Sequence, residues 1–285
     1  MLTKKLGFIG CGNIAKAIIE GMILSNKVEE SNIFIFDLNK KSVDFLKTRY
    51  SNIIILNDPE GIIEHSDLIF LCIKPHILNS VLDHFNKPKY IEDLKSGKKI
   101  LISVCAGKSI ADICAVFKDD SIFCIRTMPN LTLSICEGTW LYYENPSVDF
   151  NNSKFNPTNE IIQVLETCGR VYKINENIFS NCTVISGCGP GFVANIVQNM
   201  VNSSIEIGVP KELATNLILE TIYGTSKLLL NTNNEQDSLA FQKKVSTPGG
   251  STEAGINTLE SNGIGQLFLN CFRSSLNKCI ELGKN

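Results

Sequence analysis

Residues 5–15, which read KLGFIGCGNIA, decide the fold of the N-terminal half of this chain. A short apolar strand pattern runs directly into the spacing Gly-x-Gly-x-x-Ala, and a helical pattern follows it. In this fingerprint the first glycine suits a tight turn, the second leaves room for a pyrophosphate, and the alanine lets helix and strand pack closely. The stretch therefore predicts a dinucleotide-binding turn made by Gly10, Cys11, Gly12, Asn13 and Ile14.

The second predicted strand, residues 32–36, ends at Asp37, which bears on the choice of cofactor. An acidic residue at this place accepts hydrogen bonds from the adenosine ribose hydroxyls, which favours NADH. Lys40 and Lys41 follow at once and could instead pair with the 2′-phosphate of NADPH. The expected cofactor is thus NADPH or NADH, with NADH slightly favoured.

Composition narrows the class of protein. A chain of 285 residues with 44% hydrophobic and 20% charged residues is long enough for two ordinary globular domains. A net charge of −2 gives no reason to expect nucleic acid or an anionic membrane as a partner. No apolar run reaches the roughly 18 residues of a membrane span. The first predicted strand begins near residue 5, so we expect no targeting peptide and a cytoplasmic protein.

The cysteines and histidines do not indicate a metal site. The 11 cysteines are scattered singly through apolar segments without a C-x-x-C pair, which is typical of buried thiols in a reducing compartment. The three histidines have no metal-ligand spacing. We therefore expect no bound metal.

The order of predicted elements divides the chain in two. Through residue 175, continuous apolar strand patterns alternate with helical ones, which predicts a doubly wound, parallel Rossmann-type α/β domain over 1–175. Residues 176–285 are predicted to form an all-helical domain for substrate binding and oligomerisation. Its expected helices cover 190–208, a segment from Pro210 to about 230, 235–245, 251–261 and 263–282. A small helical domain this apolar commonly buries a face against a second subunit, the alternative being packing on its own Rossmann domain.

Unusual residues follow three further predicted strands. They are Ile73-Lys74-Pro75-His76, Ser103-Val104-Cys105-Ala106-Gly107 and Arg126-Thr127-Met128-Pro129-Asn130. Ligands of open α/β sheets bind beyond the carboxyl ends of the strands. We therefore expect these three segments to form the walls of a nicotinamide site.

A second glycine-rich turn lies near the C-terminus, in residues 245–255, VSTPGGSTEAG. The glycine pair allows a tight turn, and Ser251 and Thr252 stand where a helix would begin. A small carboxylate could bind the free N–H groups there, although the same residues would also serve as an ordinary helix cap.

With these motifs the chain resembles the Δ1-pyrroline-5-carboxylate reductases almost from end to end. The matching segments are 8–13, 72–75, 103–107, 128–130, 186–190 and 245–255. The resemblance implies an NAD(P)H-dependent oxidoreductase that reduces the C=N bond of 1-pyrroline-5-carboxylate to give L-proline. It also implies a Rossmann domain followed by a helical domain that interlocks with a partner subunit, forming homodimers and often larger rings.

The resemblance also assigns roles at the substrate site, next to the Pro-Gly-Gly turn that contains Gly249. Thr252 would hydrogen-bond the ring nitrogen of the substrate. Thr247 and the N–H groups of Gly250, Ser251 and Thr252 would hold its carboxylate. Glu235 matches a family glutamate near the substrate and is the second catalytic candidate, with a solvated helix start as the alternative.

Two rival functions would need residues that differ from those in this chain. The β-hydroxyacid dehydrogenases share this plan but use a lysine in the first long helix of the second domain, and residues 187–199 contain none. Reduction of another imine stays open. A non-catalytic dinucleotide sensor would need the cofactor turn but not the hydroxyl-bearing Pro-Gly-Gly turn.

Overall fold

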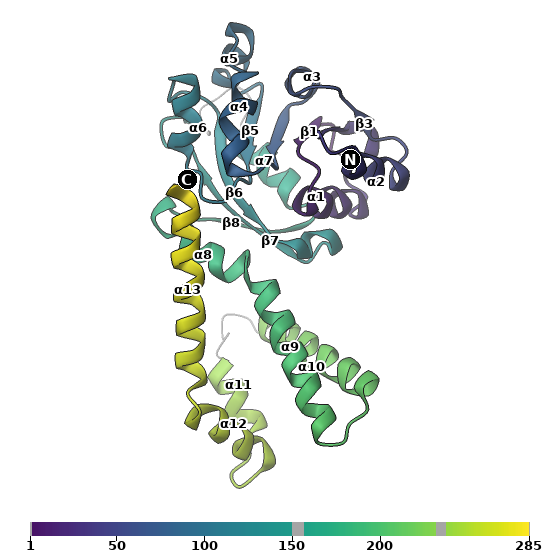
Figure 1. Cartoon of the computed structure of the whole chain (residues 1–285), viewed down its shortest axis with the longest axis vertical. Coiled ribbons are helices and arrows are strands. Elements are labelled where there is room, and N and C mark those ends of the chain that lie inside the picture. Colours follow the sequence, from purple (N-terminus) through teal and green to yellow (C-terminus); the bar gives the residue numbers. More distant parts are fainter. Residues whose placement is uncertain (1, 150–156, 232–237, 285) are drawn as a thin grey trace. The chain divides into compact units, whose positions relative to one another are not determined.

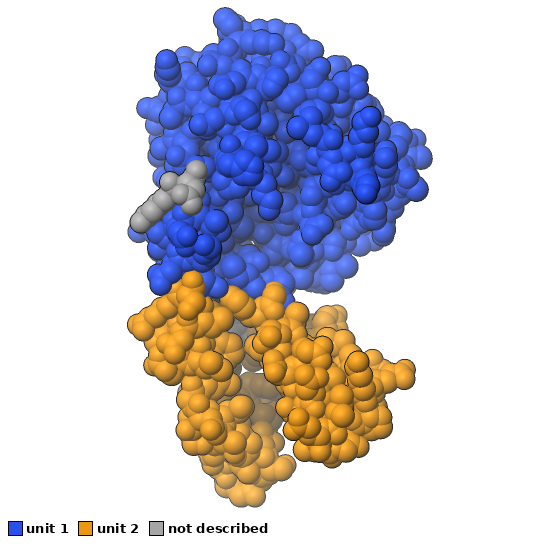
Figure 2. All heavy atoms as spheres, in the orientation of Figure 1, with its two compact units in different colours: residues 1–190, 275–285 blue, residues 191–274 orange. Residues whose placement is uncertain are grey.

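The computed structural model describes residues 2–149, 157–231 and 238–284, which form two compact units. Unit 1 comprises Met1–Pro190 and Ser275–Asn285, and unit 2 comprises Gly191–Ser274 (Figure 2). The chain thus passes from unit 1 to unit 2 and back. The predicted division after residue 175 stays a prediction.

Unit 1 is built on a sheet with helices packed around it (Figure 1). Within the described residues, this sheet has eight strands in the order β3-β2-β1-β4-β5-β6-β7-β8. Its strands are β1 (Leu6–Ile9), β2 (Ile33–Phe36), β3 (Ile54–Ile55), β4 (Leu68–Leu71), β5 (Ile100–Ser103), β6 (Cys124–Pro129), β7 (Gly138–Glu144) and β8 (Gly169–Lys173). Every neighbouring pair is parallel except β6 and β7. The predicted Rossmann-type α/β class is confirmed.

Helices cover both faces of this sheet, because successive residues of each strand point to opposite sides. The helices of unit 1 are α1 (Asn13–Leu24), α2 (Lys40–Arg49), α3 (Pro59–His65), α4 (Leu78–Asp83), α5 (Pro88–Lys95), α6 (Ile110–Phe117), α7 (Pro157–Leu165) and α8 (Phe179–Ser186). Residues of α1, α2 and α7 pack in one buried core with Phe8 and Phe70, and residues of α3, α4, α5 and α6 pack in another with Ile69 and Leu71. The described part of the unit also contains the short 3-10 helices η1 (Glu30–Asn32), η2 (Pro75–Ile77), η3 (Leu131–Ile135) and η4 (Glu176–Ile178).

The antiparallel pairing of β7 with β6 is a feature that the parallel pattern in the sequence did not indicate. Only η3 and its flanking residues connect β6 to β7. A parallel connection needs a crossover of about a dozen residues or more, so this short link reverses the chain beside β6. The reversal lies beyond β6 and leaves the carboxyl ends of the preceding strands on one common edge.

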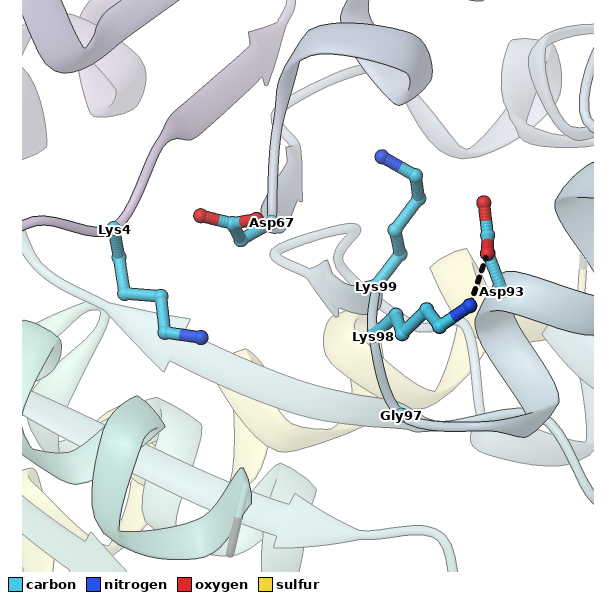
Figure 3. Close-up of a pocket in the computed structure, with 6 residues that line it drawn as sticks. All are labelled: Lys4, Asp67, Asp93, Gly97, Lys98 and Lys99. Carbon is cyan, nitrogen blue, oxygen red and sulfur yellow. Dashed lines mark ion pairs between the residues drawn. The ribbon is translucent and has the colours of Figure 1, made fainter. Parts of the chain in front are cut away.

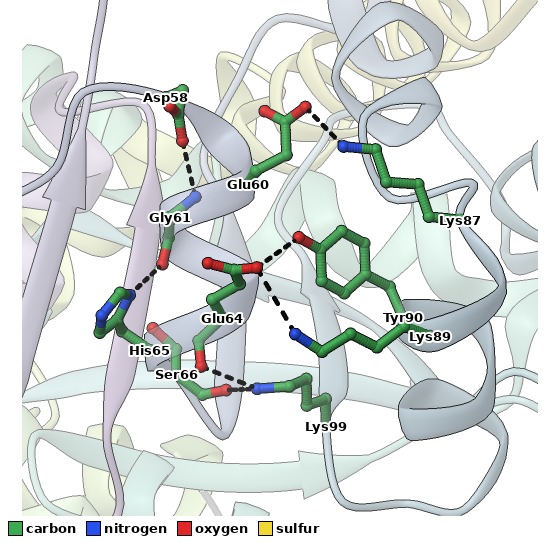
Figure 4. A network of polar contacts seen from close by, with 10 residues as sticks. All are labelled: Asp58, Glu60, Gly61, Glu64, His65, Ser66, Lys87, Lys89, Tyr90 and Lys99. Atoms are coloured by element: carbon green, nitrogen blue, oxygen red, sulfur yellow. Dashed lines mark hydrogen bonds and ion pairs between the residues drawn. The ribbon is translucent and has the colours of Figure 1, made fainter.

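Polar contacts fasten α3 to its neighbours on the sheet (Figure 4). The hydroxyl of Tyr90, in α5, donates to Glu64 at 2.8 Å, and the amine of Lys99 donates to the Ser66 carbonyl at 2.9 Å. Burial lowers the pKa of Lys99, while nearby carboxylates such as Asp93 oppose the shift. The side chain of Asp58 caps the start of α3 at Gly61 N. The network therefore adds polar contacts to the apolar packing of Ile62 and Ile63, which holds this short helix on the sheet.

Unit 2 is all helical, as the sequence predicts. It contains α10 (Lys211–Asn231), α11 (Ser238–Val245), α12 (Ser251–Ser261), most of α9 (Gly189–Glu206) and the first half of α13 (Ile264–Lys284). Rings on α9 and α13 meet, with the centroids of Phe192 and Phe272 6.1 Å apart. Within the described part of the chain, no helix is long and apolar enough to cross a membrane.

Candidate functional site

The predicted cofactor residues share one edge of the sheet in unit 1. Strands β2, β1, β4, β5 and β6 are adjacent and parallel, so their carboxyl ends lie on the same side. Asp37 follows β2 and the turn 10–14 follows β1. Segments 73–75 and 105–107 follow β4 and β5, and 128–130 ends and follows β6. The chain reverses its winding between β1 and β4, which is where ligands bind in such sheets.

The two glycines of the turn after β1 have different surroundings. Gly10 has φ +93°, and a Cβ there would stand 2.4 Å from the carbonyl oxygen of Cys72. Gly12 would meet nothing within 4 Å of a Cβ, and it is exposed. Gly10 is thus required by the fold, whereas the space beside Gly12 is open to a ligand.

Helix α1 begins beside that open space, and no side chain of the helix start offsets the partial positive charge of its N-terminus. Gly12 is the N-cap, no side chain caps the helix, and its first turn carries no acidic residue. Asn13 is exposed there. Unpaired N–H groups and the helix dipole favour a negatively charged group at such a position. The residues present therefore fit the pyrophosphate of a dinucleotide.

Asp37 is tied into the cofactor turn by both oxygens of its carboxylate. The N–H of Cys11 donates to Oδ2 and the N–H of Asn39 donates to Oδ1, each at 2.7 Å. Each oxygen keeps a lone pair for a further donor. The carboxylate therefore fixes the turn and could also accept from ribose hydroxyls. Lys40 is exposed at the start of α2.

Cys105 follows β5 and Asn130 follows β6, on the other side of the point between β1 and β4 where the winding reverses. Both side chains make their polar contacts with other groups of the protein. The Cys105 thiol is buried and contacts the carbonyl of Ile73 at 3.4 Å, and burial raises its pKa. The Asn130 amide donates to Thr139 Oγ1 and to the Ser186 carbonyl, each at 3.1 Å. These two side chains therefore support the strand ends from within the protein. Exposed Lys74 and Ala106 and half-buried Met128 remain accessible from this edge.

Arg126 is a buried cation beside this edge, at the start of the strand-end segment 126–130 that the sequence predicts to line the nicotinamide site. It is 8% exposed, pairs with Glu176 at 3.3 Å and lies 4.1 Å from the ring centroid of Phe179. Burial lowers its pKa, and the neighbouring Glu176 opposes that shift. The sequence signal for a buried ion pair is the position of this arginine inside an otherwise largely apolar strand. The guanidinium connects β6 to η4 and α8.

The Pro-Gly-Gly turn in unit 2 has a defined geometry. The N–H of Gly250 donates to the Thr247 carbonyl at 2.9 Å, and Gly249 has φ +75°. Gly250 is the N-cap of α12, which has no side-chain cap. Among the described residues, no hydrogen bond is made by the N–H groups of Ser251 or Thr252. Of the three predicted carboxylate donors, Gly250 is thus used by the turn, and the other two are free for an acceptor.

The cofactor residues belong to unit 1, and residues 247–252 belong to unit 2. Glu235 lies outside the described residues. No cluster of three or more potential metal ligands occurs in residues 2–149, 157–231 and 238–284.

A hollow of about 360 Å³ on unit 1 lies at the opposite edge of the sheet, before the amino ends of β1, β4 and β5 (Figure 3). Its charged groups are already engaged. Lys98 pairs with Asp93 at 3.6 Å, and Lys4 pairs with Glu160 at 2.9 Å. Asp67 accepts from the backbone N–H of Lys5 at 2.9 Å. The hollow therefore offers little free charge to a ligand and is separate from the cofactor edge.

Two protein families match parts of the chain. The family described as pyrroline-5-carboxylate reductase dimerisation matches residues 176–282. The family described as NADP oxidoreductase coenzyme F420-dependent matches residues 5–107.

Similar proteins cover nearly the full length. Pyrroline-5-carboxylate reductase 2 of Bacillus subtilis is 29% identical over 98% of this chain and 95% of its own. The pyrroline-5-carboxylate reductase of Synechocystis is 28% identical over 99% of this chain and 100% of its own. The crystal structure of Plasmodium falciparum pyrroline carboxylate reductase with NADP bound is 26% identical, with a TM-score of 0.83 and 99% of both chains covered.

Proposed function

We infer that this chain, which belongs to the pyrroline-5-carboxylate reductase family, reduces the cyclic imine 1-pyrroline-5-carboxylate to L-proline with NAD(P)H. The observation that carries the proposal is the end-to-end similarity to enzymes of that name, since it spans both the cofactor edge and the Pro-Gly-Gly turn. When bound, NAD(P)H supplies the hydride that the imine carbon accepts. The protein supplies placement and electrostatics.

The cofactor is proposed to lie along the carboxyl edge of the sheet. The turn Gly10-Cys11-Gly12-Asn13-Ile14 would hold the pyrophosphate at the start of α1, where the space beside Gly12 is open. Asp37 and Lys40 would face the adenosine ribose. Segments 73–75, 105–107 and 128–130 would flank the nicotinamide, with accessible Lys74, Ala106 and Met128 nearest to it.

The substrate carboxylate is proposed to bind at the start of α12. The N–H groups of Ser251 and Thr252 have no partner among the described residues, and they lie at the positive end of the helix dipole. The hydroxyl of Thr247 would add a further donor. The hydroxyl of Thr252 would hydrogen-bond the ring nitrogen and stabilise the substrate as an iminium, with water as the proton source. Glu235 is kept as a proposed neighbour of the substrate.

The assembly is proposed to be a homodimer formed through the helical domain. Residues 176–282 match the dimerisation family, and unit 2 has few buried residues of its own among those described. A larger ring and a cytoplasmic location are expectations from the sequence.

The direct test is oxidation of NADH and NADPH by the purified protein when 1-pyrroline-5-carboxylate is supplied. We expect turnover, proline as the product, and a large loss of turnover in Thr252→Ala with NAD(P)H binding retained. A folded protein that binds NAD(P)H but does not reduce this imine would overturn the proposal, and a panel of other cyclic imines would then separate an imine reductase from a sensor. Unchanged turnover in Thr252→Ala would remove the role of that hydroxyl alone.

A further inference from the structure

Glu253 stands directly beside the proposed carboxylate site and makes a hydrogen bond that no ordinary helix start requires. Its Oε2 accepts from the backbone N–H of Gly249 at 2.8 Å. In a capping box, a glutamate at this position of a helix reaches back to the N–H of the N-cap residue. Here the N-cap is Gly250, whose N–H already donates to the Thr247 carbonyl. Glu253 therefore reaches one residue further, into the turn itself.

The bond acts on the one peptide unit of the turn that has two available orientations. Thr247–Gly250 is closed by a hydrogen bond between its first and last residues, and its third residue, Gly249, has φ +75°. Proline cannot adopt a positive φ, so Pro248 at the second position makes this a type II turn. Types I and II differ mainly by a flip of the central peptide, whose N–H belongs to Gly249. The Glu253 carboxylate holds that N–H and so selects the type II form.

The orientation of this peptide sets the path of the chain into α12. Gly250 follows with an extended backbone, φ −83° and ψ 165°, and the free N–H groups of Ser251 and Thr252 come next. The same carboxylate also brings a negative charge close to the place where the substrate carboxylate would bind. Glu253 is half-buried, so its charge is only partly screened by solvent.

We propose that Glu253 is a positioning residue for imine reduction, which fixes the substrate turn through Gly249 and at the same time weakens binding of the substrate carboxylate through its charge. This inference rests on the proposed function. The hydrogen bond and the charge have opposite effects on catalysis, so substitutions that separate them give opposite results.

Three variants separate the two effects. Glu253→Gln keeps an acceptor of the same reach and removes the charge, so we expect KM for the imine to fall about twofold to fivefold with kcat unchanged. Glu253→Asp keeps the charge but is too short for the bond, and we expect kcat/KM for the imine to fall about tenfold. Glu253→Ala removes both and should also lower kcat. KM for NAD(P)H should stay the same in all three.

Glu260→Gln is the matched control, because it removes one negative charge from the same helix two turns further on. We expect its kinetic constants to equal those of the wild type. Equal kinetics in all three Glu253 variants and the wild type would overturn the proposal. A parallel loss in Gln and Asp variants would show that the carboxylate contacts the substrate instead of the turn.

A second measurement does not depend on turnover. With selective ¹⁵N-glycine labelling, the amide proton of Gly249 should stay downfield in Glu253→Gln and move upfield in Glu253→Asp and Glu253→Ala. An unmoved resonance in the last two would overturn the role of Glu253 in the turn. Absence of wild-type turnover with this resonance pattern intact would instead contradict the proposed function.

Discussion

At the scale of single residues, Gly10 and Gly12 separate folding from cofactor binding. Gly10→Ala places a Cβ 2.4 Å from the Cys72 carbonyl oxygen at φ +93°, so we expect a loss of about 2 kcal/mol or more in the free energy of unfolding. Gly12→Ala meets no atom within 4 Å and should leave stability nearly unchanged. It should raise the Kd for NADPH about tenfold or more, because the pyrophosphate needs that space.

Urea unfolding and a titration of cofactor fluorescence measure the two quantities. The idea fails if Gly12→Ala unfolds as easily as Gly10→Ala, or if it binds NADPH like the wild type.

Asp37 is where cofactor preference can be tested. Its carboxylate holds the N–H groups of Cys11 and Asn39, and it would repel a 2′-phosphate. We expect Asp37→Ser to shift the ratio of kcat/KM values towards NADPH about tenfold, an effect of roughly 1.4 kcal/mol. Lys40→Ala is the opposing control, since loss of that cation should disfavour NADPH. If Asp37→Ser leaves the ratio unchanged, Asp37 has only the structural role.

The buried thiol of Cys168 should make the free energy of unfolding decrease at alkaline pH. Burial, the largest cause, raises its pKa from 9.0 to about 12 in the folded protein. The pKa of the thiol is higher in the folded protein than in the unfolded chain, so the buried neutral thiol contributes to the free energy of unfolding. This contribution is complete below pH 9 and is lost between about pH 9 and 12. When the pH is raised from about 8 to about 10.5, the free energy of unfolding measured in urea should fall in both proteins. The fall should be about 1–2 kcal/mol smaller in Cys168→Ala than in the wild type. Cys271→Ala, at a partly exposed position, should follow the wild type; equal slopes in all three would contradict the assignment.

At the scale of elements, the Pro-Gly-Gly turn and α12 offer a matched pair of substitutions. A Cβ on Gly250 would stand 2.6 Å from Thr247 Oγ1 and 2.9 Å from its carbonyl oxygen, whereas Gly255 in α12 has nothing within 4 Å. We expect Gly250→Ala to lower kcat/KM for the imine about tenfold and to leave the Kd for NADPH unchanged. Gly255→Ala should keep full activity and, if anything, stabilise the helix. Similar activity in the two variants would show that the turn is not part of the site.

The sequence predicted elements best where local chemistry determines them. The bounds of α12, residues 251–261, follow from two glycines that end a turn and from hydroxyl residues at a helix start, and they match the structure. The direction of β7 and the two-residue length of β3 depend on connection length and on pairing partners, which no local pattern contains. In the same way, the strand ends predicted the cofactor edge, but not that Asn130 is fully engaged behind it.

At the scale of the whole molecule, the path of α13 could not be read from the sequence. Its apolar periodicity is continuous, yet residues from Ser275 onward belong to unit 1. One close contact there is between backbones, since a Cβ on Gly283 would stand 2.8 Å from the Gly107 carbonyl oxygen. Such a fit depends on the tertiary structure, because nothing in the sequence indicates that two glycines so far apart will meet.

Unit 2 also lacks the core that an independent domain needs. Among its described residues, only Val201, Ala214 and Ile218 are buried. Large apolar side chains on α10 and α13 are exposed, including Leu217 at 52% and Leu267 at 69%. Apolar surface on this scale marks an interface, and the match to a dimerisation family points to a second copy of this chain as the occupant.

We therefore expect a homodimer whose unfolding midpoint rises with protein concentration, because dissociation and unfolding of the helices are coupled. Leu217→Glu and Leu267→Glu should each shift the species seen by analytical ultracentrifugation towards monomer and lower the midpoint by several degrees. Leu24→Glu is the control, since Leu24 ends α1 in unit 1 and is 57% exposed. It adds the same charge and should leave the dimer intact. A wild-type monomer with a concentration-independent midpoint would rule out the second copy, and the exposed helices of unit 2 would then need a different partner.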